Sequence, residues 1–423
     1  MKSGIAALLA AASCAGIAQA QTAAAPAAAE TTLTLEEALQ RAGAISPARQ
    51  VAELGVEAAQ AGRTVAGLRP NPTLNADVEN AFGTGPYKGI GEVETTIGLA
   101  LPLELGGKRA ARIAVADTRI ARARIDAIAA GADLGLQVTQ AYIRAVSAQR
   151  RLAVAQDQLR VTGENLRIAR DRVMAGANSP IDEQRAALLA TGAQAELERS
   201  HSTVEATRLA LGQLIGGLPP ASLDQEWFDR LDAAPYGPAA PANAEGTLAL
   251  AAATADVATA DAQLRLARSQ RIPDLTVSVG TRRLQASGDM AMVFGVSVPL
   301  PAFDNGRAAM RQAAAQRDQS EARRRLARFE AEQAIAAARA DRDRAAAGVR
   351  ASAPTIAAAQ EAARIARIGY GAGKFDQLVL LEAEQALLDA RTAAIDARAQ
   401  YHDAAARLAR LTTPARLPAP AGN

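Results

Sequence analysis

The chain has 423 residues, of which 49% are hydrophobic but only 3% are aromatic, and its formal net charge is +3. So few aromatic residues, among many Ala, Leu, Arg, Gln and Glu, are typical of long helices or coiled coils and argue against an ordinary globular core. A net charge this small gives no strong electrostatic attraction to nucleic acid, so we expect no nucleic-acid partner.

The first 20 residues have the features of a secretory signal peptide. Lys2 supplies the positive end, residues 5–17 are apolar, and a small-x-small motif predicts cleavage between Ala20 and Gln21. The only cysteine, Cys14, lies in this segment, so cleavage leaves a chain without a thiol. Lipidation of Cys14 is the alternative to cleavage at Ala20, and the sequence leaves both open. Residues 21–32 form a low-complexity leader that we expect to be disordered.

The remainder repeats one plan at a spacing of about 200 residues: "RPNPTLNADV" in the first half matches "RIPDLTVSVG" in the second. We expect a helix–strand–strand–helix unit at 33–215, a linker rich in Pro and Gly at 216–246, a second unit at 247–412, and a disordered tail at 413–423. Trp227 and Phe228 of the linker are expected to pack around the middle of the helices.

Apolar residues recur every seven positions in the predicted long helices, which predicts packing against partner helices. No proline interrupts residues 107–179 or 305–353, so the first long helix is expected to reach on the order of 100 Å, too long for a compact domain. The two apolar series are Val138, Ala145, Leu152, Leu159, Leu166 and Val173, and Leu380, Leu387, Ala394, Tyr401 and Leu408.

Four segments of about ten residues alternate apolar and polar side chains, which is the length that a tilted membrane strand needs. Because no later stretch reaches 18 consecutive apolar residues, any crossing of a membrane must use these strands. Four strands cannot close a barrel alone, and free edges in lipid cost several kcal/mol per unpaired group, so several chains must share one barrel. A small soluble sheet is the alternative. The predicted strands are 73–82, 92–101, 274–284 and 290–299.

Each pair of strands ends at a proline and then a glycine-containing corner that leads into a long helix. We expect the glycines to relieve the corner. Lys108 and Arg109, which follow the first corner, are expected to be solvated or to anchor the chain at an interface. The predicted junction residues are Pro102, Gly106, Gly107, Pro299 and Gly306.

This pattern resembles the TolC-type outer-membrane efflux family over residues 33–411. "RPNPTLNADVEN" at 69–80 and "ELGGKR" at 104–109 are similar to its heavy-metal resistance branch, the CzcC-like proteins, whereas "PAFDNGRAAM" at 301–310 follows the more general family pattern. The resemblance implies a mainly α fold with a small β part. It implies a homotrimer whose chains each give four strands to a shared outer-membrane β-barrel that continues into a long periplasmic helical barrel.

The resemblance also implies a function in a Gram-negative outer membrane. The protein would be the exit duct of a tripartite system with a periplasmic adaptor and a proton-driven inner-membrane pump of the RND type. The exported substrates would be cobalt, zinc, cadmium, nickel, copper or silver cations, and the sequence does not choose among them. Two alternatives stay open: an exit channel for organic compounds or type I secreted polypeptides, and a non-conducting periplasmic coiled-coil protein.

Two groups of residues are candidate functional sites. Four acidic residues on polar strand faces would lower the cost of passing cations if they face the lumen, unless they are merely solvated or ion-paired: Asp77, Glu79, Glu92 and Glu94. The turns between long helices should form a periplasmic tip, with glycines in left-handed conformations and Ser179 and Asp376 as helix caps. In the family these turns meet the adaptor, which gives as candidates Gly176, Ser179, Asp182, Gly373, Lys374 and Asp376; Gly371 is a further candidate for a left-handed helix end.

Catalysis finds no support in the sequence. "GYGAGKF" at 369–375 has no Ser or Thr after the lysine, so it is not a phosphate loop, and no metalloprotease or hydrolase motif is present. We therefore expect no enzyme activity and no cofactor. His201 and His402 are the only histidines and are expected to be exposed, which gives no support for a dedicated metal site.

Overall fold

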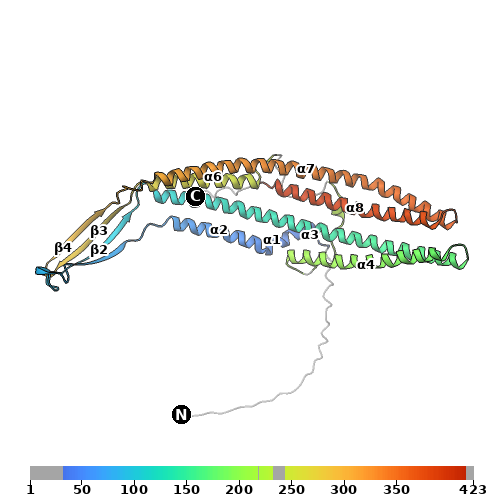
Figure 1. The fold of residues 1–423 in the computed structure, drawn as a ribbon, viewed down its shortest axis with the longest axis horizontal. Helices are drawn as coiled ribbons and strands as arrows, with labels where there is room; N and C mark the ends of the chain where they lie inside the picture. Colours follow the sequence, from blue (N-terminus) through green and yellow to red (C-terminus); the bar gives the residue numbers. More distant parts are fainter. Residues whose placement is uncertain (1–31, 218, 232–242, 416–423) are drawn as a thin grey trace, which may run out of the picture.

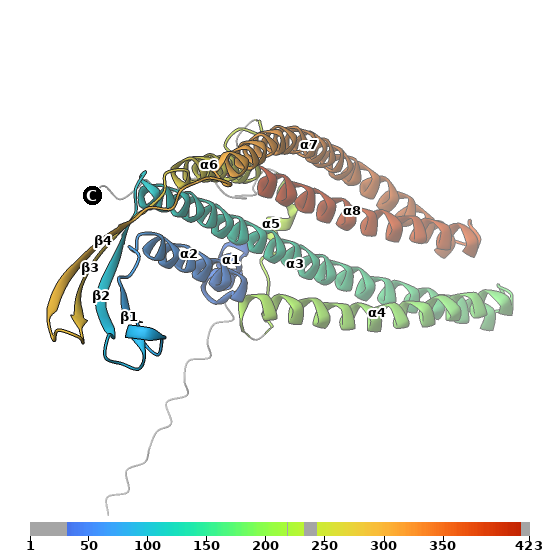
Figure 2. The ribbon, with the colours of Figure 1, turned by 60° about the vertical axis from the view of Figure 1, so that its left-hand side comes forward.

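The computed structural model describes residues 32–217, 219–231 and 243–415. The predicted signal peptide, its cleavage site, Cys14 and the end of the tail lie outside these residues. The described chain is elongated, with a curved sheet at one end and the turns of two helix hairpins at the other (Figures 1 and 2). Among the described residues, none of the helices combines the length and the apolar character that crossing a bilayer requires.

Each half of the chain has the predicted order of elements, so the two-unit architecture is confirmed. The first half contains α1 (Leu35–Ile45), α2 (Pro47–Ala66), β1 (Thr73–Glu79), a short 3-10 helix η1 (Gly85–Tyr87), β2 (Glu94–Leu103), α3 (Lys108–Met174) and α4 (Pro180–Ile215). The connecting segment contains α5 (Glu226–Asp229), and the second half contains α6 (Leu248–Gln270), β3 (Leu275–Leu284), β4 (Met290–Ser297), α7 (Arg307–Gly371) and α8 (Gln377–Leu411).

The long helices α3 and α7 have 67 and 65 residues, which corresponds to about 100 Å each. In the half of the molecule away from the sheet, α3 packs on α4 and α8, and α7 packs on α8. Helix α7 runs through Pro354 and is therefore longer than its proline-free stretch. A proline removes one backbone hydrogen bond, and the packing of α7 along α8 stabilises the helix on both sides of that gap.

The four strands form one antiparallel sheet in the order β1-β2-β3-β4. Strand β1 ends three residues earlier than predicted, because Asn80 and Phe82 both have a φ of 58° and leave the extended region. Strand β2 lies two residues later than predicted and continues through Pro102. Since β1 begins opposite Ala100, Pro102 has a neighbouring strand on one side only, where its missing N–H costs least.

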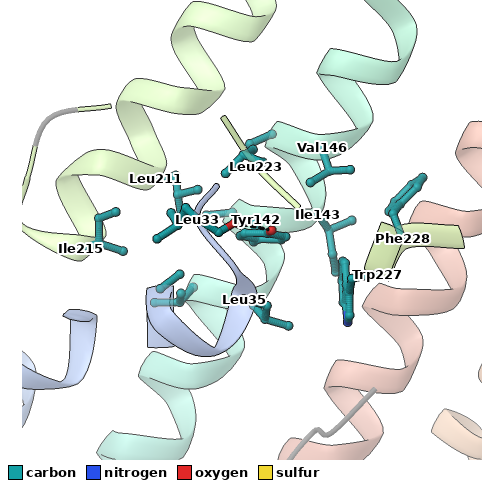
Figure 3. Packing of buried hydrophobic residues seen from close by; sticks show 14 of the residues in the cluster. Leu33, Leu35, Tyr142, Ile143, Val146, Leu211, Ile215, Leu223, Trp227 and Phe228 are labelled. Carbon is teal, nitrogen blue, oxygen red and sulfur yellow. Dashed lines mark hydrogen bonds between the residues drawn. The ribbon is translucent and has the colours of Figure 1, made fainter. Parts of the chain in front are cut away.

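Among the described residues, the largest buried cluster surrounds the middle of α3 (Figure 3). Tyr142 of α3 is fully buried, and its hydroxyl lies 2.8 Å from the carbonyl of Leu33, which pairs with Leu223 in a β-bridge. Trp227 and Phe228 are also buried here, as the sequence predicts. The cluster joins the start of the first unit to the connecting segment.

The prediction that both histidines are exposed is wrong for His402, which is 1% exposed, whereas His201 is exposed. The ring centroids of His402 and Trp227 are 4.2 Å apart, and the imidazole Nε2 lies 3.1 Å from the carbonyl oxygen of Phe228. Burial lowers the pKa of His402, so the neutral ring is favoured. Trp227 and Phe228 of the connecting segment bury the His402 ring, and the helical periodicity of α8 does not indicate that burial.

Candidate functional site

The two faces of the sheet differ sharply in chemistry. The register places most of the large apolar side chains of the four strands on one face, and many of these are exposed, up to 75% at Phe294. A continuous exposed apolar face of this kind marks an interaction surface rather than an ordinary protein surface. It includes Leu74, Val78, Ile97, Leu99, Leu101, Val279, Met292, Phe294 and Val296.

The opposite face carries mostly polar and small side chains. Three of the four predicted acidic residues lie there: Asp77 and Glu79 on β1, and Glu94 on β2 directly opposite Glu79. Glu92 does not join them, because it lies in the turn before β2 instead of in the predicted strand. Like charges directly opposite each other across two strands are destabilising unless something compensates them.

Arg282 of β3 compensates this charge and was missing from the predicted site. Its guanidinium lies 2.9 Å from Glu79 and 2.8 Å from Glu94, and its Nε donates to the Thr96 hydroxyl at 3.0 Å. The alternation of β3 already assigns Arg282 to the polar face. Its two carboxylate partners follow only from the register, which brings the first and second halves of the chain together.

The corner between β2 and α3 is held by charged residues of "ELGGKR" together with Arg112 of the first turns of α3. Gly106 and Gly107 have φ values of 69° and 72°, the left-handed conformation that glycine adopts readily. Arg112 forms a bidentate pair with Glu104, and its hydrogen bond lowers the pKa of that carboxyl. Arg112 also donates to the carbonyls of Ala66 and Leu68 at 3.2 and 3.0 Å, which ties the end of α2 to the corner.

Lys108 differs from its prediction, since its side chain is only 12% exposed and its Nζ lies 2.7 Å from Asp274 at the start of the second strand pair. Arg109 is exposed and donates to the carbonyl of Gly67 at 2.6 Å. At the second corner, Gly306 is also left-handed, with a φ of 70°, and Pro299 lies just after β4. There the Gly306 N–H donates to the Asp304 carboxylate at 2.9 Å, and the Arg271 guanidinium donates to the carbonyl of Asn305 at 3.4 Å.

The tip consists of the α3–α4 and α7–α8 turns. Gly176 and Gly373 have φ values of 69° and 71°, as the sequence predicts, whereas Gly371 is the last residue of α7 and is not left-handed. Ser179 and Asp376 occupy the predicted cap positions, but their side chains make no capping hydrogen bond. The remaining candidates are Asp182, which accepts from Asn178 at 3.0 Å, and the exposed Lys374.

The two hairpins contact each other near this tip. Gln377 of α8 donates to the backbone carbonyl of Asp182 at 2.9 Å, and the Arg172 guanidinium lies 4.4 Å from the ring centroid of Tyr370. Further from the turns, Glu384 of α8 is 5% exposed and accepts from Asn165 of α3 and from Arg367 of α7.

Burial raises the pKa of Glu384 despite its two hydrogen-bond donors. This carboxyl therefore links three helices in a poorly solvated place. Within the described ranges, no three His, Cys, Asp or Glu side chains come together as the ligands of a metal ion would.

Comparison with known proteins decides the family. The family model for outer membrane efflux proteins matches residues 34–217 and 244–413, which is most of the chain. The chain belongs to the outer membrane efflux protein family. A relative is the cobalt-zinc-cadmium resistance protein CzcC of Cupriavidus metallidurans, 29% identical over 90% of each chain.

Solved structures share the fold of this outer membrane efflux protein. A membrane protein from Pseudomonas aeruginosa superposes with a TM-score of 0.76 at 24% identity, covering 91% of this chain and 90% of its own. The outer membrane protein VceC of Vibrio cholerae gives a TM-score of 0.73 at 20% identity, with 90% and 96% covered. The chain is thus an outer membrane efflux protein similar to CzcC, and its family consists of transport proteins.

Proposed function

We propose that this protein is the exit duct of a tripartite, proton-driven efflux system and that it exports heavy-metal cations. The observation that carries the proposal is a sheet with an exposed apolar face and an acidic opposite face, continuous with helices of about 100 Å. The apolar face suits lipid, and the acidic face suits a water-filled path for cations. The similarity to a protein named for cobalt, zinc and cadmium resistance supports this substrate class.

We propose that the duct is a homotrimer. Strands β1 and β4 each have only one neighbour in the sheet, and unpaired backbone groups in lipid are costly, so the edges of one chain need those of another. Further along the molecule α2 and α7 are the outermost helices in the order α2-α3-α6-α7, so they continue the same two edges. The family resemblance suggests three chains and the twelve strands of a shared barrel.

The acidic residues are proposed to favour cations in the lumen: Asp77, Glu79 and Glu94 on the strands and Glu92 in the adjoining turn. Replacing all four by Gln should reduce the cation preference of single channels in planar bilayers. An unchanged preference would show that these carboxylates are only solvated or structural.

The tip turns are proposed to contact a periplasmic adaptor that connects the duct to an RND pump. Candidates for this contact are Gly176, Ser179, Asp182, Gly373, Lys374 and Asp376. Cross-linkers placed by Ser179→Cys and Lys374→Cys should give adducts with the adaptor. His201→Cys, on the exposed surface of α4 away from the turns, is the matched control and should give none. Adducts at His201→Cys but at neither tip position would show that the adaptor does not bind the tip turns.

Metal sensitivity of a deletion strain tests the substrate class. Loss of the gene should lower the tolerated concentration of one or more of cobalt, zinc, cadmium, nickel, copper and silver, and the wild-type gene should restore it. If metal tolerance is unchanged and the strain becomes sensitive to organic compounds, the protein exports organic compounds instead of metal cations. If metal tolerance is unchanged and a secreted polypeptide is lost, the protein is a secretion channel.

A further inference from the structure

Arg282 connects three strands on the acidic face of the sheet. Its two terminal nitrogens contact Glu79 of β1 and Glu94 of β2, and its Nε donates to Thr96, the residue directly across from it on β2. The Arg282 side chain is 34% exposed, so the cluster lies at the surface and not in a sealed interior. A guanidinium with three nitrogens engaged in this way is held in one orientation.

The charge balance of this face gives Arg282 a special position. The strand residues whose side chains share the face carry three carboxylates, those of Asp77, Glu79 and Glu94, and a single cation, Arg282. The face therefore has a net charge of −2 in each chain, and two of its three carboxylates are directly compensated. Fixed charges along a pore set the local concentration of permeant ions, so this one side chain reduces the negative potential that a passing cation meets.

We infer that Arg282 is a selectivity-determining residue of the duct: by compensating Glu79 and Glu94, it limits the preference for cations and leaves Asp77 as the uncompensated carboxylate of the strands. This inference rests on the proposed function as a channel. The same contacts position Glu79 and Glu94, because the guanidinium removes the repulsion between two carboxylates that lie directly opposite each other.

Reversal potentials in planar bilayers with a KCl gradient test the inference, and the chain offers a matched control. Arg282→Gln should shift the reversal potential toward the K⁺ equilibrium potential and so raise the permeability ratio of K⁺ over Cl⁻, since the net charge of the face changes from −2 to −3 per chain. Arg283→Gln removes the same charge from the next residue, which lies on the apolar face, and should leave the ratio unchanged. Arg282→Lys should restore the wild-type ratio.

The ionic strength provides a second signature of a charge effect. At about 1 M salt the Debye length falls to roughly 3 Å, so the difference between Arg282→Gln and wild type should shrink relative to 0.1 M. A shift caused only by altered packing would persist at high salt, and that result would overturn the inference.

If Arg282→Gln fails to assemble, a second pair of variants tests the inference instead. Loss of heat-modifiable migration on gels would show that failure. Glu94→Gln alone leaves a net charge of −1, and Arg282→Gln/Glu94→Gln returns it to −2 without leaving two carboxylates opposed. The double variant should therefore be more cation-selective than the single one, and equal ratios would refute the inference. If the wild-type protein itself forms no conducting pores, the proposed channel function fails instead.

Discussion

Replacing Arg112 by Ala should loosen the corner between sheet and helices without unfolding the rest of the molecule. Arg112 forms a bidentate pair with Glu104, whose side chain is 13% exposed, and donates to the carbonyls of Ala66 and Leu68. Arg112→Ala would leave that carboxylate partly buried without its cation and would remove both donors. The ends of α2, β2 and α3 would then lose their shared anchor.

The magnitude follows from how deeply the pair is buried. Breaking a fully buried ion pair costs about 3–5 kcal/mol, and an exposed pair contributes about 1 kcal/mol or less. Because the Arg112 side chain is 30% exposed, the pair lies between these limits, and we expect a cost of about 2 kcal/mol. A local opening that becomes easier by about 2 kcal/mol is populated roughly 30-fold more.

Hydrogen exchange followed by mass spectrometry measures this opening directly. Amides in a peptide covering 103–115 should exchange roughly 30-fold faster in Arg112→Ala, whereas a tip peptide covering 174–182 should be unchanged. Arg109→Ala is the matched control, because Arg109 is exposed and donates only to Gly67 in the contacts described, so its effect should be well under tenfold.

The pH dependence of the exchange adds a check of the mechanism. The hydrogen bond from Arg112 lowers the pKa of Glu104, so the pair stabilises the fold fully above the ordinary carboxyl pKa. This stabilisation is lost as the pH falls through the lowered value, and wild type and Arg112→Ala should then converge. Equal exchange at neutral pH, or faster exchange spread over the whole chain, would refute a local role for the pair.

Three further predictions concern the helices, and chemical denaturation followed by the helical circular dichroism checks each of them. Glu384→Gln should stabilise the protein at neutral pH, because burial raises the pKa of Glu384 and its charged form costs stability. The gain in stability should vanish as the pH falls below about 4.3, and a gain that is the same at every pH would contradict this cause. Gly369→Ala should destabilise the turn between α7 and α8, since the new Cβ would lie 2.1 Å from the Phe375 ring. The control Gly371→Ala has open space around its new Cβ, so it should be neutral or stabilising by up to about 1 kcal/mol. Equal effects of the two variants would exclude the clash. Tyr142→Phe should cost about 1 kcal/mol by removing the hydroxyl donor from a buried site, and no cost would mean that its hydrogen bonds contribute nothing net.

Much of the fold was readable from periodicity within single segments. The alternation in 73–82 and 92–101 identified β1 and β2, and the left-handed glycines Gly106 and Gly176 were found because helix ends and corners need them. One error in the strands was local too. Strand β1 ends early because Asn80 turns left-handed, and alternation carries no signal for that change.

The candidate site divides in the same way. Asp77, Glu79 and Glu94 were placed on one face from spacing alone, since side chains alternate across a strand. The alternation of β3 places Arg282 on a polar face, but it does not identify Glu79 and Glu94 as its partners. No pattern in the sequence singles out Glu384. One of its hydrogen-bond donors, Asn165, comes from α3, which is distant in the chain from α8, and the other, Arg367, comes from the preceding helix α7.

The sequence by itself determined the elements of this protein, their order and the chemistry of each strand face, because backbone geometry repeats every two residues in a strand and every 3.6 in a helix. Only the tertiary structure decided which charges meet and which histidine is buried. Those contacts join Arg282 to Glu79 and His402 to Trp227, and they depend on the register and packing of segments far apart in the chain, which no local period encodes.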